Sequence, residues 1–238
     1  MNIVIPAAGR GQRFREAGYL LPKPLIDVAG RTMISRVVAS LMPKGEHRVV
    51  VAVPPGTPEM YDVEQVVINK TTDGAARTVA LAIHMAQLDL NEPLLVSNSD
   101  QIVDFDIDEF INMAHGTAGS MVVFYAPGGS PKWSYARTRK RRVLEVAEKR
   151  PISEYATAGV YYWTRTADFL YAATKMIEDD DRTNGEFYVA PVYNYMIYNY
   201  MVRDTANITS YPILAASFHS MGTPEDLKTY IEYLKERA

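Results

Sequence analysis

The residues best suited to bind phosphate lie near the start of the chain. Gly9-Arg10-Gly11-Gln12-Arg13 follows a short apolar run, and Lys23 stands between Pro22 and Pro24. Glycines let backbone N–H groups approach phosphate oxygens, and nearby cations neutralise a polyphosphate. The two prolines restrict the backbone around Lys23, which reduces the entropy lost when its ammonium is held at an anion. These features favour a triphosphate site over the alternative, a tight turn with exposed arginines.

Two familiar phosphate-binding motifs do not fit this segment. A Walker A loop needs Gly-Lys-Ser/Thr, which does not occur, and the Rossmann Gly-x-Gly-x-x-Gly has Phe14 in place of its third glycine. A different nucleotide-binding arrangement is therefore expected.

A candidate metal ligand follows a later apolar run. Asp100 lies in Ser97-Asn98-Ser99-Asp100-Gln101, directly after the predicted strand Leu94 to Ser97. Ligands of α/β proteins bind at the carboxyl ends of strands, and Mg²⁺ takes one or two carboxylates together with substrate phosphates. Asp100 is therefore predicted to bind Mg²⁺; a simple turn or helix cap is the alternative.

Alternating apolar strands and amphipathic helices position these segments. Strands are predicted at 3–8, 49–53, 66–69, 94–97 and 121–125, and helices at 32–42, 75–88 and 106–114. This alternation is typical of an α/β protein with a largely parallel sheet and right-handed crossovers. Strands at 133–137, 143–147 and 158–163 and helices at 167–177, 188–198 and 225–235 are predicted to complete the same sheet. One domain spanning residues 1–238 is expected.

Composition excludes several function classes. The 238 residues carry 25 basic and 28 acidic side chains, a formal net charge of -3, which provides no global field for nucleic acid or an anionic membrane. No cysteine is present, so thiol chemistry and thiolate metal sites are excluded. No apolar stretch reaches the ~18 residues of a membrane helix, so a cytoplasmic protein that binds neither membrane nor nucleic acid is expected.

Five segments in order resemble the sugar-nucleotide pyrophosphorylases, nucleotidyltransferases with a GT-A-like (Rossmann-like) α/β fold. They are PAAGRGQRF with LPKPL, then DGAARTVALA, SNSDQ, VAEKRPISEYATAGVYYW and MGTPEDL. The chain looks most like the small single-domain branch linked to capsule and surface-polysaccharide genes, which shares segments such as PKWSYA and GEFYVAPVYN. That branch includes cytidylyltransferases acting on unusual phosphorylated acceptors.

The resemblance implies a role for each matching residue. Backbone around the nucleotide would come from Ala7, Ala8, Gly9 and Gly11, while Asn69 and Gly74 would face the base. Arg13 and Lys23 would bind the β and γ phosphates as catalytic residues, together with Asp100 on Mg²⁺. The acceptor would be held by Lys149 on its phosphate and by Glu148 and Gly159 on its body. CTP or UTP is favoured as the nucleotide.

One position departs from the family pattern. Better-studied members carry a second metal aspartate where Ser220 stands here. A hydroxyl is a poorer Mg²⁺ ligand than a carboxylate, so either Asp100 and the phosphates suffice or another acid has replaced the missing one. Asp104 is a candidate, although a polar loop residue is slightly favoured, and His219 fits less well because Mg²⁺ prefers oxygen donors.

The sequence thus predicts transfer of a nucleoside monophosphate from an NTP to a phosphorylated small-molecule acceptor, a sugar 1-phosphate or related phosphate, with release of pyrophosphate. Two alternatives stay open: a glycosyltransferase of the GT-A fold that consumes a nucleotide sugar, and a catalytically silent module that senses nucleotides. Whether the protein forms a homo-oligomer is also left open.

Overall fold

A computed structural model describes residues 1–60, 63–198 and 207–237. The strands are β1 (Asn2–Pro6), β2 (Asp27–Val28), β3 (Arg31–Thr32), β4 (Arg48–Val53), β5 (Glu64–Val67), β6 (Leu94–Ser97), β7 (Gln101–Val103), β8 (Gly119–Tyr125), β9 (Ser134–Arg139), β10 (Arg142–Glu148), β11 (Tyr155–Trp163), β12 (Ile208–Ile213) and β13 (Phe218–Ser220). The α-helices are α1 (Gln12–Glu16), α2 (Met33–Ala39), α3 (Ala75–Met85), α4 (Ile107–Ala114), α5 (Thr166–Glu178), α6 (Val192–Ile197) and α7 (Pro224–Lys235). Two 3-10 helices cover Lys23–Leu25 and Ala215–Ser217.

A 9-stranded mixed sheet in the order β5-β4-β1-β6-β11-β8-β12-β10-β9 forms the centre of the fold. The first four strands are parallel, and β11 joins them antiparallel to β6. The far end curls back, because β9 also pairs with β11 and closes a ring of β11, β8, β12, β10 and β9. The second half of the chain therefore completes the sheet of the first half, as the sequence predicts.

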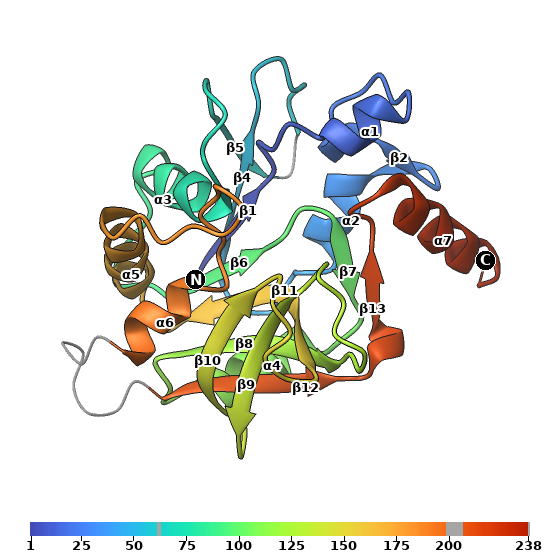
Figure 1. Cartoon of the computed structure of the whole chain (residues 1–238). Coiled ribbons are helices and arrows are strands. Elements are labelled where there is room, and N and C mark those ends of the chain that lie inside the picture. Colours follow the sequence, from blue (N-terminus) through green and yellow to red (C-terminus); the bar gives the residue numbers. More distant parts are fainter. Residues whose placement is uncertain (61–62, 199–206, 238) are drawn as a thin grey trace.

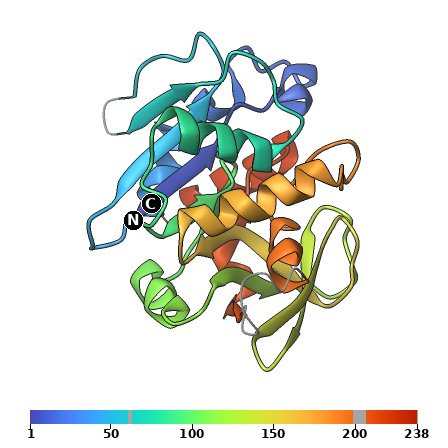
Figure 2. The ribbon, with the colours of Figure 1, turned by 90° about the vertical axis from the view of Figure 1, so that its left-hand side faces the viewer.

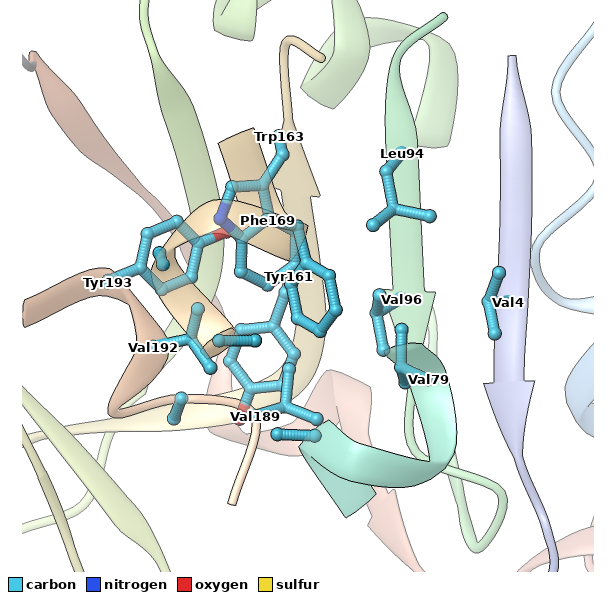
Figure 3. Close-up of a cluster of buried hydrophobic side chains, with 14 of the residues drawn as sticks. Val4, Val79, Leu94, Val96, Tyr161, Trp163, Phe169, Val189, Val192 and Tyr193 are labelled. Carbon is cyan, nitrogen blue, oxygen red and sulfur yellow. The ribbon is translucent and has the colours of Figure 1, made fainter. Parts of the chain in front are cut away.

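Helices cover both faces of this sheet (Figures 1 and 2). Alternate residues of β1 point to opposite faces: Val4 belongs to the apolar cluster that includes residues of α3 and α5, whereas Ile3 and Ile5 belong to the cluster that includes residues of α2, α4 and α7. On the first face Trp163 stacks on Tyr193 of α6, with ring centroids 4.4 Å apart (Figure 3). Burying both faces fixes the register of the strands, because a slip by one residue would expose their apolar side chains.

The helix boundaries agree with the sequence prediction where capping residues mark them. Thr32 accepts the N–H of Ser35 at the start of α2, and Asp106 accepts the N–H of Glu109 at the start of α4. The helix expected over 188–198 is shorter, because α6 begins only after Pro191. A residue before proline is disfavoured in the α region, so Tyr188 lies outside the helix.

Within the described ranges, none of the helices has both the length and the apolar character needed to cross a bilayer.

Candidate nucleotidyltransfer site

The loop after β1 lies at the carboxyl edge of the parallel strands. The N–H of Ala7 donates to Ala52 O at 2.8 Å, so it continues the β1–β4 pairing, and Ala7 and Ala8 are buried while Gly9 is exposed. Gly11 has a left-handed conformation with φ +58° and begins α1. A Cβ at Gly11 would lie 3.1 Å from the Cβ of Lys23. The glycine therefore lets the predicted phosphate loop pack directly against Lys23.

Lys23 joins this loop to the predicted metal ligand. Its ammonium lies 2.5 Å from Oδ2 of Asp100, and both side chains are mostly shielded from solvent, at 17% and 29% exposure. The ammonium also lies 5.4 Å from the ring centroid of buried Phe14. Two residues 77 positions apart in the sequence therefore meet at one place.

Gly159 lies beside the segment that carries Asp100. Because β11 runs antiparallel to β6, with Val160 opposite Ser97, Gly159 is adjacent to the end of β6. Asn98 N donates to Gly159 O at 2.9 Å, and the Gln101 amide donates to Ala158 O. A Cβ at Gly159 would lie 1.9 Å from Nε2 of Gln101. Glycine at position 159 therefore leaves room for the Gln101 and Asn98 side-chain amides, and its φ of +65° lies in the left-handed region that favours glycine.

Glu148 ends β10 and is largely buried in a polar network. Its carboxylate accepts a hydrogen bond from Ser134, its cross-strand partner in β9. Burial raises the pKa of Glu148, the nearby Glu186 carboxylate adds to this effect, and Ser134 and Lys149 oppose it. The Glu148 side chain therefore offers hydrogen-bond acceptor oxygens at a position that is shielded from solvent.

Lys149 follows immediately in the chain and contacts Tyr188. Its ammonium donates to the Tyr188 hydroxyl and lies 4.4 Å from the ring centroid. Burial raises the pKa of Tyr188 and the carboxylate of Glu186 raises it further, while Arg13 lowers it. The effect of Arg13 on the pKa of Tyr188 indicates that its guanidinium lies on the same side of the molecule as the Lys149–Tyr188 contact.

The two residues predicted to face the base are less closely connected to this cluster. Asn69 is exposed in the segment that follows β5, and its role stays a prediction. Gly74 packs against the backbone of Phe187, where a Cβ would lie 2.3 Å from both the nitrogen and the oxygen. Phe187 N donates to Asp73 O at 2.8 Å and Ala76 N donates to Phe187 O at 3.0 Å. Gly74 thus joins the start of α3 to the segment that carries Tyr188.

The alternatives considered for a second metal ligand lie apart from Asp100. Asp104, beyond the other end of β7, pairs with Nε2 of His219 at 3.1 Å and is 56% exposed. The His219 ring packs on Tyr230 and Tyr233 of α7. Among residues 1–60, 63–198 and 207–237, no three His, Cys, Asp or Glu side chains are grouped to hold a metal. Asp104 thus lies in an exposed ion pair with His219, and its role at the metal stays a prediction.

Two polar residues near Glu148 and Lys149, Ser134 and Tyr188, are not among the predicted site residues. The sequence leaves Glu186 open, either as a cap of the helix that follows it or as a contact to the acceptor. Tyr188 sits in a tyrosine-rich segment whose spacing indicates helix packing, which is correct for Tyr193 but not for Tyr188. Pro191, after which α6 begins, is the sequence feature that could have indicated that Tyr188 lies outside the helix. Ser134 could be found only through its cross-strand pairing with Glu148, which the sequence does not reveal.

Comparisons with known proteins agree with this geometry. The family model for the MobA-like NTP transferase domain matches residues 3–158. Probable mannose-1-phosphate guanylyltransferase 2 of Arabidopsis thaliana is 31% identical over 139 residues, which cover 52% of this chain and only 38% of that protein. The matched part of the chain thus spans less than half of this curated relative.

Two solved structures share nearly the whole fold. The nucleoside-diphosphate-sugar pyrophosphorylase from Vibrio cholerae RC9 has a TM-score of 0.82 and 26% identity, covering 97% of this chain and 99% of that one. The inositol-1-phosphate CTP transferase from T. maritima has a TM-score of 0.72 and 18% identity, covering 99% and 96%; this second likeness shows the fold alone. Since the family model covers more than half of the chain, the chain belongs to the family of MobA-like NTP transferase domains.

Proposed function

We propose that this chain transfers a nucleoside monophosphate from an NTP to a phosphorylated small-molecule acceptor and releases pyrophosphate. The observation that supports this most directly is the Lys23–Asp100 contact at 2.5 Å. It joins the glycine-containing loop to a carboxylate at the carboxyl end of β6, where α/β proteins bind their ligands. The activities of the relatives named above point to the same reaction class.

The proposed reaction needs no protein nucleophile. A phosphate oxygen of the acceptor attacks the α-phosphorus of the NTP, a new P–O bond forms, and the bond to the β-phosphate oxygen breaks. A phosphate monoester has its second pKa near 6 and is largely ionised at neutral pH, so no general base is required. Catalysis then consists of aligning two anions and neutralising their charge.

Four residues contribute to this alignment and charge neutralisation. Arg13 and Lys23 stabilise charge on the departing pyrophosphate, and Lys149 binds the acceptor phosphate and offsets the repulsion between the reactants. Asp100, an oxygen donor at the phosphate loop, fits a hard divalent cation and would hold Mg²⁺, which when bound supplies charge neutralisation at the phosphates. The Lys23 ammonium neutralises the Asp100 carboxylate in this structure. A divalent ion held by Asp100 would supply that charge and leave Lys23 available to phosphate.

For the acceptor we propose a sugar 1-phosphate or a related phosphate with several hydroxyl groups. Glu148, Ser134 and Tyr188 present hydrogen-bonding groups beside Lys149, which suits a polar body attached to the phosphate. Mannose 1-phosphate and inositol 1-phosphate appear in the names of two of the proteins compared, and both are of this class. For the nucleotide we propose CTP or UTP.

Pyrophosphate release tests the proposal. Each of the four common NTPs is incubated with Mg²⁺ and a panel of acceptor phosphates, using wild type and the variants Arg13→Ala, Lys23→Ala and Asp100→Asn. Each removed charge contact should cost about 2–4 kcal/mol of transition-state stabilisation, a drop in kcat/KM of roughly 30- to 1,000-fold. Lys44→Ala serves as a control, because the Lys44 side chain is 90% exposed and pairs with Asp108 outside the site.

The rivals give different outcomes. A glycosyltransferase would consume a nucleotide sugar and release a nucleoside diphosphate, with no pyrophosphate from any NTP. A sensing module would bind nucleotide without turnover. If pyrophosphate is released but all three variants match the Lys44→Ala control, the reaction class stands and the site assignment is wrong.

A further inference from the structure

Ser220, which stands where the family resemblance places a second metal aspartate, lies close to Asp100 in space. Ser220 in β13 pairs with Gln101 in β7, and Met221 N donates to Asp100 O at 2.7 Å. A Cβ built on Gly222 would lie 3.4 Å from both Asp100 Oδ2 and Ser220 Oγ. The carboxylate and the hydroxyl therefore border one small space.

The donors around this space suit a hard cation. Asp100 and Ser220 offer oxygen atoms, the ligand type that Mg²⁺ prefers. Asp226 in the first turn of α7 adds a second carboxylate behind Ser220 and is 23% exposed. Each carboxylate already attracts a cation in the protein: Lys23 lies on Asp100, and the Lys132 ammonium lies 3.4 Å from Asp226 Oδ1. The residues thus fit the divalent ion that the family implies.

The hydrogen bonds of Ser220 direct its proton away from this space. Ser220 Oγ donates to Asp226 Oδ2 at 3.1 Å, since an ionised carboxylate can only accept. Gly222 N donates to Ser220 Oγ at 3.2 Å. A hydroxyl has one proton and two lone pairs, so one lone pair remains after these two bonds. Asp226 therefore makes Ser220 an acceptor toward any further partner.

Asp226 is held in place for this contact. Thr223 Oγ1 accepts the N–H of Asp226 at 3.1 Å and caps α7. The Asp226 carboxylate itself is directed to Ser220 and Lys132. His219 and Asp104 do not compete for the same position, because successive residues of a strand face opposite sides and His219 packs on Tyr233 of α7.

We propose that Ser220 and Asp226 act as a pair that replaces the missing carboxylate of the metal site. Ser220 Oγ provides the oxygen ligand, and Asp226 fixes its proton and supplies the negative charge. The pair completes the site that Asp100 begins, so this inference rests on the proposed function. Asp226 is a positioning residue that acts through Ser220.

Binding of Mn²⁺, followed by its electron paramagnetic resonance signal, tests the pair without relying on turnover. Titrations with Mn²⁺ are run alone and with α,β-methylene CTP, on wild type and on Ser220→Ala, Asp226→Asn and Asp100→Asn. Loss of a residue that orients a metal ligand typically weakens metal affinity 10- to 100-fold. We expect Ser220→Ala and Asp226→Asn each to fall in that range, and Asp100→Asn to lose at least as much.

A rescue variant separates this role from a merely structural one. Ser220→Asp in the Asp226→Asn background places a carboxylate directly at the site and should restore Mn²⁺ affinity to within a few-fold of wild type. Glu225→Gln is the matched control: this exposed acid lies in the same first turn of α7, so general helix electrostatics would affect it equally. Thermal unfolding of every variant confirms that each is folded.

The outcomes distinguish this inference from the proposed function. If Asp100→Asn loses Mn²⁺ but Asp226→Asn binds it like wild type, or if Ser220→Asp fails to rescue, the pair is overturned and the function stands. If wild type binds no Mn²⁺, or Asp100→Asn keeps full affinity, the metal site of the proposed function fails as well.

Discussion

At the scale of single residues, Lys149 combines a strained backbone with a functional side chain. Its φ is +55°, a left-handed conformation that costs a residue with a Cβ about 1–2 kcal/mol. The same conformation brings the ammonium to the Tyr188 hydroxyl. Strain of this kind persists where the surrounding structure compensates for it, often at binding sites.

Two substitutions at Lys149 separate strain from function. Lys149→Ala and Lys149→Gly both remove the ammonium, so both should raise the KM for the acceptor phosphate at least about tenfold, the effect of losing a hydrogen bond to a charged group. Only glycine relieves the left-handed strain, so we expect Lys149→Gly to be about 1 kcal/mol more stable than Lys149→Ala in urea denaturation. Equal stabilities would contradict the strain argument.

Glu148 gives a pH-dependent prediction. Its pKa is raised above the ordinary 4.5 by burial, so folding favours the protonated carboxyl group. The stability contributed by this group is fully present below pH 4.5 and is lost as the pH rises through the pKa of the folded state. Glu148→Gln removes that loss and keeps an oxygen that can accept from Ser134. The variant should therefore be more stable than wild type near pH 7, with the difference shrinking toward about pH 4.

The measurement is the free energy of unfolding at both pH values, with the acceptor KM at pH 7. Glu145→Gln is the comparison, because Glu145 lies in the same strand as Glu148 and its carboxylate is ion-paired with Arg137 and Arg150. The Glu145→Gln variant should therefore be less stable than wild type. A Glu148→Gln protein that is less stable than wild type near pH 7 would contradict this prediction. It would show that contacts with Ser134 and Lys149 stabilise the ionised carboxylate by more than burial destabilises it.

At the scale of elements, the glycine at the start of α3 controls how two halves of the site meet. Gly74 has φ +139° and ψ 164°, a region open essentially to glycine alone, and it faces the Phe187 backbone. Gly74→Ala should destabilise the protein by more than about 3 kcal/mol or separate α3 from the Tyr188 segment. Gly185→Ala is the control, because Gly185 has φ +80° but open space around it, and it should cost only about 1–2 kcal/mol.

Urea denaturation of both variants tests this difference. If Gly74→Ala costs no more than Gly185→Ala, then the close approach of the two backbones is not what makes glycine necessary at position 74.

The elements also show which parts of the fold a sequence can predict. Strands and helices with clear apolar periodicity or a capping residue, such as α2 after Thr32 and α4 after Asp106, were predicted within a few residues. The short strands β7 and β13 were not, because three residues carry no periodic pattern and their stability comes from pairing with each other. The 208–213 strand was missed as well, since Pro212 argues against a strand.

The candidate site likewise contains residues that the sequence suggests and residues that only the structure reveals. Arg13, Lys23 and Asp100 could be proposed from the sequence because their residue types and neighbours suggest phosphate and metal chemistry. Ser134, Tyr188 and Asp226 act through contacts across strands or between distant segments, such as the Ser220–Asp226 hydrogen bond. Spacing along the chain does not report such contacts, so these residues needed the structure.

At the scale of the whole molecule, the mixed sheet accommodates the two substrates of the proposed reaction. Its parallel half carries the phosphate loop and Asp100, while Glu148 and Lys149 come from the closed ring of strands in the other half. The two halves are joined at β6 and β11, where Gly159 contacts the Asp100 loop. In the proposed reaction, a nucleotide bound on the first half would lie next to an acceptor bound on the second.

This arrangement predicts a thermal response to nucleotide that depends on both loops. Ligand at 100 times its Kd stabilises a folded protein by about 2.7 kcal/mol, which for a chain of this size raises the Tm by roughly 5–10 °C. We expect CTP or UTP with Mg²⁺ to give such a shift and ATP or GTP to give less. Lys23→Ala and Asp100→Asn should reduce it strongly, because they remove the cation and the metal ligand at the phosphates, whereas Lys44→Ala should keep it. A larger shift with a purine nucleotide would overturn the proposed base preference and leave the phosphate site intact; a shift unchanged in both site variants would place the nucleotide elsewhere.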